Sequence, residues 1–134
     1  MKKILICGPR DTPPSQFEHM LKVVLDLYDP STGYEKPIQI INGGAAGADA
    51  LATKVAVTLN IPYLIVPAQW EKGAGAGPER NQKMIDMKPD LVLAWFCPAV
   101  GLTSGTGDTV RRADKARIPI KLIAFHRKES DVKD

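Results

Sequence analysis

The feature that most constrains the fold of this chain is the regular alternation of short apolar runs with segments of helical periodicity. Short apolar runs bounded by glycine or proline are typical of strands, and apolar residues at every third or fourth position are typical of helices. The predicted strands are residues 3–7, 38–41, 63–66, 91–96 and 120–124. The predicted helices are residues 15–27, 47–59, 78–87 and 108–116. Such alternation indicates parallel strands joined by helices.

Most of the predicted strands lack the regular apolar–polar alternation of a half-exposed strand. Near-continuous apolar runs such as 38–41 and 91–96 are typical of parallel strands covered by helices on both faces. Right-handed crossovers between them give a doubly wound arrangement. The sequence therefore predicts one α/β domain over residues 1–125 with a polar tail at 126–134. The domain is expected to be a Rossmann-like, mostly parallel five-stranded sheet with helices on both faces.

Composition narrows the class of protein further. A chain of 134 residues with 44% hydrophobic and 25% charged residues is expected to form one globular domain. No apolar run reaches the ~20 residues of a membrane span, and the apolar stretch near the N-terminus is too short for a signal peptide. Cys7 and Cys97 lie in apolar stretches, which favours reduced thiols and a cytoplasmic location. The net charge of +3 is too small to indicate nucleic acid as a partner.

Glycine is concentrated at the ends of the predicted strands and before the predicted helices. Most of the 11 glycines fall within residues 8–11, 43–49, 73–77 and 101–108. Ligands of open parallel sheets bind beyond the carboxyl ends of the strands, and glycine allows the backbone to approach a ligand closely. A helix that begins there offers free N–H groups and a positive dipole end, which suit a phosphate. The sequence therefore predicts an anion site at this edge of the sheet.

The candidate ligand-binding residues come from these loops and from the polar or aromatic residues beside them. They are Gly8, Arg10, Gly43, Gly44, Gly47, Asp49, Trp70, Asn81, Ser104, Gly105, Thr106 and Gly107. Phosphate is expected on Gly43-Gly44 and on Gly105-Thr106-Gly107, with Arg10 and Arg80 neutralising its charge. Trp70 is suited either to stacking on a base or to packing under the loop. Asp49 is suited either to capping its helix or to accepting ribose hydroxyls.

Several common catalytic motifs are absent. The chain has no Gly-x-Gly-x-x-Gly dinucleotide fingerprint, no Gly-Lys-Ser/Thr phosphate loop and no Gly-x-Ser-x-Gly elbow. His19 and His126 have no second ligand-type neighbour in the sequence, so we expect no metal site, no cofactor and no histidine-based triad. Both histidines are predicted at the surface, Trp95 in the core, and Cys97 as a small buried hydrophobe.

Four motifs in a fixed order carry a family resemblance. They are ICGPRD at 6–11, NGGAAGAD at 42–49, GAGPERNQKM at 75–84 and GTGDTVRRA at 105–113. Together they resemble the YspA/YpsA-related branch of the SLOG superfamily, over residues 3–124. That superfamily is similar to the LOG nucleotide phosphoribohydrolases and to the DNA-processing protein DprA. The resemblance implies a Rossmann-like domain that binds nucleotides or nucleotide-derived ligands.

The resemblance also implies candidate catalytic residues. In LOG enzymes a Pro-Gly-Gly-x-Gly-Thr-x-x-Glu loop and an upstream arginine carry out N-glycosidic cleavage. Gly105-Thr106 matches the Gly-Thr pair, Arg80 is the counterpart of the arginine, and Thr109 occupies the glutamate position with Asp108 just before it. Asp108 would then activate water or stabilise the ribosyl centre, while Arg80 holds the phosphate or orients the sugar.

Three functions remain open at this point. The first is nucleotide binding, with or without N-glycosidic cleavage, and the second is a non-catalytic sensor of a nucleotide signal. A weaker third is a DprA-like single-stranded nucleic-acid binder that uses the basic residues 111–121. A homodimer is an open alternative to a monomer, as LOG relatives are oligomeric.

Overall fold

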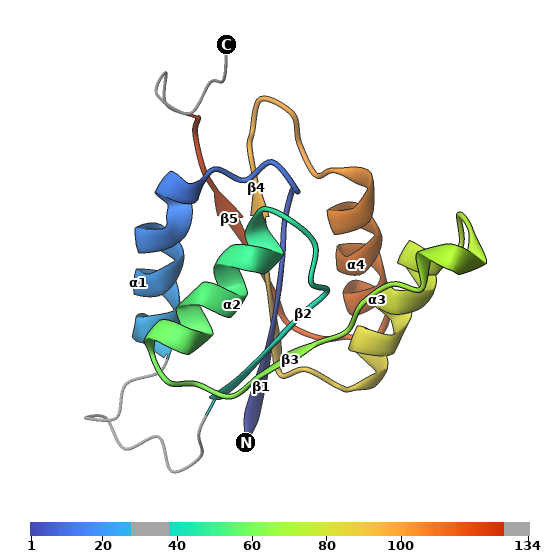
Figure 1. Ribbon diagram of the computed structural model, residues 1–134, viewed down its shortest axis with the longest axis horizontal. Helices are drawn as coiled ribbons and strands as arrows, with labels where there is room; N and C mark the ends of the chain where they lie inside the picture. Colours follow the sequence, from blue (N-terminus) through green and yellow to red (C-terminus); the bar gives the residue numbers. More distant parts are fainter. Residues whose placement is uncertain (28–37, 128–134) are drawn as a thin grey trace.

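The computed structural model describes residues 1–27 and 38–127, and it contains one five-stranded sheet with two layers of helices (Figure 1). The strands are β1 (Lys2–Cys7), β2 (Ile38–Asn42), β3 (Tyr63–Ile65), β4 (Leu91–Phe96) and β5 (Ile120–Ala124). The helices are α1 (Phe17–Leu27), α2 (Ala48–Thr58), α3 (Ala76–Asp86) and α4 (Ser104–Lys115). Short 3₁₀ turns, η1 (Pro14–Gln16) and η3 (Trp70–Lys72), precede α1 and α3. The predicted turn-rich connection at 28–37 and the tail after residue 127 lie outside the described residues.

The strand order is β3-β2-β1-β4-β5, and every neighbouring pair is parallel. In the central strand, Leu5 lies beside Ile41 of β2 and Val92 of β4. The chain leaves β1 toward β2 on one side and later returns to place β4 on the other. The order of strands therefore reverses at β1, which is the position where open α/β sheets bind ligands. The predicted fold class is confirmed.

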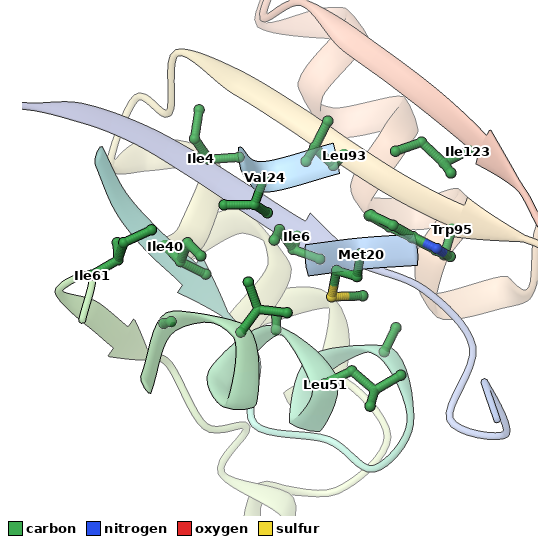
Figure 2. Close-up of a cluster of buried hydrophobic side chains, with 14 of the residues drawn as sticks. Ile4, Ile6, Met20, Val24, Ile40, Leu51, Ile61, Leu93, Trp95 and Ile123 are labelled. Atoms are coloured by element: carbon green, nitrogen blue, oxygen red, sulfur yellow. The ribbon is translucent and has the colours of Figure 1, made fainter. Parts of the chain in front are cut away.

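Two pairs of helices cover the two faces of the sheet. Ile4 and Ile6 of β1 point into the core under α1 and α2, while Leu5 and Cys7 point into the core under α3 and α4. Figure 2 shows the first of these cores, whose labelled side chains come from α1, α2, β1, β2, β4 and β5, with Ile61 from the segment between α2 and β3. Trp95 is fully buried there and Cys97 is buried beside it, as predicted. Each fully buried aliphatic side chain contributes roughly 1.5–3 kcal/mol.

Two helices begin earlier than the sequence predicts. The prediction of a helix start at Asp108 is wrong, because α4 begins at Ser104 and its first turn already includes Gly105 and Gly107. The N–H of Gly107 donates to the carbonyl of Thr103 at 2.7 Å, which closes that turn. Neither Gly105 nor Gly107 has a positive φ, so the helix runs through them. Similarly, α3 begins at Ala76, two residues before the predicted start.

The remaining surface predictions are confirmed where the structure describes them. His19 and His126 are exposed, and Nδ1 of His19 lies 3.0 Å from Oε1 of Gln16. The edge strand β3 differs from the inner strands, because all three of its side chains are exposed. None of the described helices is both long enough and apolar enough to span a membrane.

Candidate functional site

A cavity of about 710 Å³ lies at the carboxyl ends of the strands, beside the point where the strand order reverses. Its walls come from the segments that follow β1, β2 and β3 and from the first turns of α3 and α4. The following predicted residues line it: Gly8, Arg10, Asp49, Trp70, Arg80, Asn81, Ser104, Gly105, Thr106 and Asp108. The fold therefore brings together side chains that are spread over most of the chain.

Four of the predicted glycines do not line this cavity, and they are Gly43, Gly44, Gly47 and Gly107. Gly47 has a φ of +73°, and a Cβ there would overlap the carbonyl groups of Pro9 and Arg10. The next amide, of Ala48, donates to the carbonyl of Pro9 at 3.2 Å. Glycine at this position therefore lets the start of α2 pack against the loop after β1. The close approach that Gly47 allows is therefore between two segments of the protein backbone, not between the backbone and the cavity.

Gly43 supports an arginine of the cavity. Its carbonyl accepts a hydrogen bond from Nη1 of Arg80 at 2.7 Å. A Cβ on Gly43 would overlap the guanidinium of Arg80 and lie 3.0 Å from Oδ2 of Asp49. Gly44, with a φ of +73°, donates its amide to Oδ1 of the buried Asn42 at 2.8 Å. Gly43 thus makes room for the guanidinium of Arg80 at the cavity, whereas a Cβ on Gly44 would meet Ile65.

Arg80 and Asn81 join the loop after β2 to helix α4. Nε of Arg80 donates to Oδ1 of Asn81 at 2.9 Å, and Nδ2 of Asn81 donates to Oδ2 of Asp108 at 3.0 Å. Burial lowers the pKa of Arg80, the charge of Asp49 opposes this, and Arg10 adds to it. Because each donor in this series has a bonded acceptor, the orientation of the Arg80 guanidinium is fixed before any ligand arrives.

Asp108 is held as a carboxylate by donors on both oxygens. Arg111 donates to Oδ1 at 3.2 Å, and Nε of Arg112 donates to Oδ2 at 2.8 Å, alongside Asn81. Burial alone would raise the pKa of Asp108, but the bonds from Arg112 and Asn81 and the charges of both arginines hold it below its ordinary value. Asp108 is therefore ionised at neutral pH and is suited to electrostatic stabilisation rather than to proton transfer.

Asp49 lies in the first turn of α2 and has a different environment. Its side chain is buried, with the residue only 7% exposed, and Oδ2 accepts the amide of Ala45 at 3.1 Å. No ion pair of Asp49 within 4.0 Å is found among the described residues. Burial raises its pKa to about 6, although the amides of Ala45 and Gly43 and the charges of Arg80 and Arg10 act in the opposite direction. This carboxyl group therefore changes charge near neutral pH.

Trp70 presents an aromatic face at the cavity. The residue is 55% exposed, and the guanidinium carbon of Arg10 lies 5.3 Å from the centre of its ring. One edge of the indole approaches Gly77, where an added Cβ would lie 3.4 Å from the ring. The exposed face suits stacking and the edge near Gly77 suits packing against the loop, so both alternatives for Trp70 stand. A guanidinium already occupies the kind of stacking position that a base can take.

Sequence reasoning missed other residues of the wall, among them Thr103, Thr109 and Arg111. Thr109 is 2% exposed and donates its hydroxyl to the carbonyl of Gly105 at 3.2 Å. Arg111 was grouped with a solvated basic face. A helix that begins at Ser104 places positions 104, 108 and 111 on one side, so the missing signal was the true start of α4.

The first turn of α4 also leaves backbone donors available. The side chain of the N-cap residue Thr103 does not cap a backbone amide of α4, and its hydroxyl instead donates to Oγ1 of Thr106 at 3.0 Å. The first amides of any helix lack intrahelical acceptors, and they carry the positive end of its dipole. Among the described residues, no three His, Cys, Asp or Glu side chains converge into a metal-binding group. What the cavity offers instead is amides, arginines and one aromatic ring.

The fold and the position of the cavity define a Rossmann-like α/β protein with a site at the strand-order reversal. The structure is similar to the X-ray structure of TM1055, a structural genomics target, with a TM-score of 0.60 and 19% sequence identity. The similarity covers 90% of this chain and 72% of that chain. No protein-family profile and no curated protein sequence matches the chain. The comparison thus establishes the fold and leaves the ligand to be inferred from the site.

Proposed function

We propose that this cavity binds a nucleotide or a nucleotide-derived ligand through its phosphate. The observation that carries the proposal is the meeting of three features in one cavity: the first turn of α4, the arginines Arg10, Arg80 and Arg111, and the exposed ring of Trp70. Helix N-termini and guanidinium groups bind phosphate, and an aromatic face binds a base. The volume of the cavity falls in the range of small-molecule sites, roughly 300–1,000 Å³.

The parts of such a ligand have distinct partners in this proposal. Phosphate binds at the amides of Ser104 to Thr106, with Arg10, Arg80 and Arg111 supplying positive charge. The base stacks on Trp70, where it takes the place of the Arg10 guanidinium. The ribose hydroxyls face the carboxyl group of Asp49.

We also propose that the chain belongs to the SLOG superfamily. The four motifs that carry the resemblance all contribute to the cavity or to the packing directly behind it. The similarity of fold to TM1055 is consistent with this proposal, since a Rossmann-like domain is what the resemblance implies. The assignment to the YspA/YpsA-related branch of that superfamily rests on the motifs alone.

A thermal-shift titration tests the binding proposal. AMP, NAD, ADP-ribose and a cyclic nucleotide are compared with adenosine and ribose, which lack phosphate. A ligand at a hundred times its Kd adds about 2.7 kcal/mol of stability, so we expect a clear rise in Tm for at least one phosphate-bearing compound. Arg10→Gln should weaken that response, and Lys115→Gln, which removes an exposed charge outside the cavity, should leave it unchanged. No stabilisation by any of the phosphate compounds would contradict the proposal.

The finer proposal is cleavage of the N-glycosidic bond, with Asp108 and Arg80 as its candidate catalytic residues. Water attacks C1′ of the ribose, the bond from C1′ to the base breaks, and the base leaves with a proton from that water. The observation that favours this step is the ionised carboxylate of Asp108 on the cavity wall, which suits a positively charged ribosyl centre. Because both of its oxygens are bonded to arginines, its part is electrostatic.

Base release separates cleavage from sensing. Nucleoside monophosphates are incubated with the protein, and free base is measured by chromatography. Cleavage predicts release that Asp108→Asn abolishes and Asp114→Asn, a change outside the cavity, preserves. Native mass spectrometry that recovers an intact nucleotide would instead favour a sensor, and it also gives the oligomeric state. Salt-sensitive binding of single-stranded DNA would favour the DprA-like alternative.

A further inference from the structure

The carboxylates of the cavity differ in whether an arginine is paired with them. Asp11 pairs with Arg127, and Asp108 pairs with two arginines of its own helix. Asp49 lines the same cavity but makes no ion pair within 4.0 Å among the residues that the structure describes. It is also buried, so water does not replace the missing partner. A buried carboxylate without a paired cation is costly in its charged form.

The charged and titratable groups that face Asp49 come from three elements. Cys7, at the end of β1, is a buried thiol whose pKa is raised by burial and by the charge of Asp49. Arg10, in the loop after β1, and Arg80, on α3, are the cations whose charges reach the carboxyl group. Neither is within ion-pair distance of it. Both are among the arginines to which the proposed phosphate would bind.

We propose that a phosphate-bearing ligand enters this cavity together with a proton, which Asp49 takes up. The inference rests on the proposed function. A phosphate bound by Arg10 and Arg80 draws on the cations that now offset the Asp49 carboxylate, and it adds a second negative charge to a buried site. Protonation of Asp49 removes the repulsion and turns the carboxyl group into a hydrogen-bond donor.

The local structure tolerates this change of charge. The amides of Ala45 and Gly43 donate to the Asp49 carboxyl, and a protonated carboxyl keeps an oxygen that accepts from an amide. The loop after β2 therefore keeps its shape in both states. The pKa of Asp49, which burial raises to about 6 without ligand, is already close to neutrality, so a nearby phosphate need raise it only modestly.

Proton uptake by Asp49 on binding predicts the direction in which ligand affinity changes with pH. Below the pKa of the free protein Asp49 is already neutral, and binding does not depend on it. Above that pKa every binding event must take up a proton, so affinity falls by about tenfold for each pH unit until the pKa of the complex is reached. Proton release on binding would have the opposite sign.

Isothermal titration calorimetry with AMP and ADP-ribose tests the inference. ADP-ribose carries no phosphate that titrates near neutrality, so proton uptake on its binding comes from the protein. The phosphate of AMP does titrate in this range, but its contribution is the same for every variant. For the native chain we expect a net uptake of up to one proton per ligand at pH 7, measured from buffers of different ionisation enthalpy, and weaker binding at pH 8 than at pH 6. Asp49→Asn should abolish this uptake and bind more tightly than the native chain at pH 8. Asp114→Asn should behave as the native chain.

The outcomes separate the inference from the function on which it rests. Binding with no proton uptake by the native chain overturns the inference and leaves nucleotide binding intact. This result needs no variant, so it stands even where Asp49→Asn fails to fold. Uptake that persists in Asp49→Asn also overturns the inference. Absence of binding by both probes from pH 5.5 to 8.5 overturns the proposed function and the inference together.

Discussion

Two aspartates on one cavity have opposite electrostatic environments. Asp49 in the first turn of α2 is buried, accepts bonds from loop amides and has its pKa raised to about 6 by burial. Asp108 on α4 is partly buried, but three donors from Asn81, Arg111 and Arg112 reach its oxygens, and they outweigh burial to lower its pKa. The same type of side chain is thus a proton acceptor near neutral pH at Asp49 and a lasting negative charge at Asp108.

The difference shows what each region contributes. Two carboxyl groups whose environments move their pKa values apart are typical of sites that need both a fixed charge and a movable proton. Arg80 and Asn81 connect the two regions, since one bonds to Gly43 beside Asp49 and the other bonds to Asp108. The carboxyl group on the α2 side of the cavity, Asp49, therefore changes charge with pH near neutrality. The carboxyl group on the α4 side, Asp108, stays ionised there.

The largest expected effect comes from Asp49→Asn. The pKa in the fold lies above the ordinary value of 3.8, so the charged form destabilises the native state above pH 6 and no penalty remains below about pH 3.8. A rise from 3.8 to about 6 corresponds to a cost on the order of 3 kcal/mol. We expect the variant to be more stable than the native chain by up to this amount at pH 8, and equal to it near pH 4. Urea denaturation at both pH values measures this, and a variant that is less stable at pH 8 would contradict the raised pKa.

Asp108→Asn should have the opposite sign. Its pKa is lowered in the fold, so its stabilising contribution is present above the ordinary carboxyl pKa and is lost as pH falls. Removal of hydrogen bonds to a charged group costs about 2 kcal/mol at pH 7. The loss should shrink as the pH falls through the lowered pKa of Asp108, because the native side chain is then itself protonated. Equal stability of the two chains at pH 7 would show that the arginine pairs around Asp108 contribute nothing.

Trp70→Ala tests whether the space between the two aspartates is a ligand site. The indole is 55% exposed, so we expect the free energy of unfolding to change by less than about 0.5 kcal/mol. Base stacking contributes about 1–3 kcal/mol, so the Kd for a stabilising nucleotide should rise about tenfold or more. Val57→Ala, an exposed apolar change on α2, is the control for affinity. Unchanged nucleotide affinity in Trp70→Ala would exclude stacking on this ring.

The smallest effect is expected for Arg111→Gln. The Arg111 side chain is 73% exposed, and its pair with Asp108 is 3.2 Å long, so its loss should change the free energy of unfolding by less than about 0.5 kcal/mol. Arg112→Gln should cost more, because that side chain is 32% exposed and also bonds to Gln82 of α3. Urea denaturation of the two variants measures the difference. Equal losses would mean that burial does not set the strength of the two pairs.

Much of the fold could be predicted from the sequence, and less of the site. The apolar runs predicted all five strands. In β1, β2 and β4 the pattern reflects burial on both faces, whereas the edge strand β3 has an apolar run although its three side chains are exposed. The predicted start of α4 was wrong, because the sequence does not distinguish a glycine in ordinary helical geometry from a glycine that ends a helix. The cavity position was predictable, since glycine and polar clusters followed the strands. The separate roles of Gly43 and Gly47 were not, because each depends on atoms from a distant segment.

The sequence by itself determined a doubly wound parallel sheet and the edge at which the cavity forms, because both follow from patterns within short segments. Only the tertiary structure decided the charge states of Asp49 and Asp108. A pKa depends on burial and on partners, and these partners are remote in the chain: Arg80 reaches back 37 residues to Gly43, and Asn81 lies 27 residues from Asp108. Local sequence places an aspartate at the start of a helix. The neighbours that the fold supplies determine whether it keeps its proton.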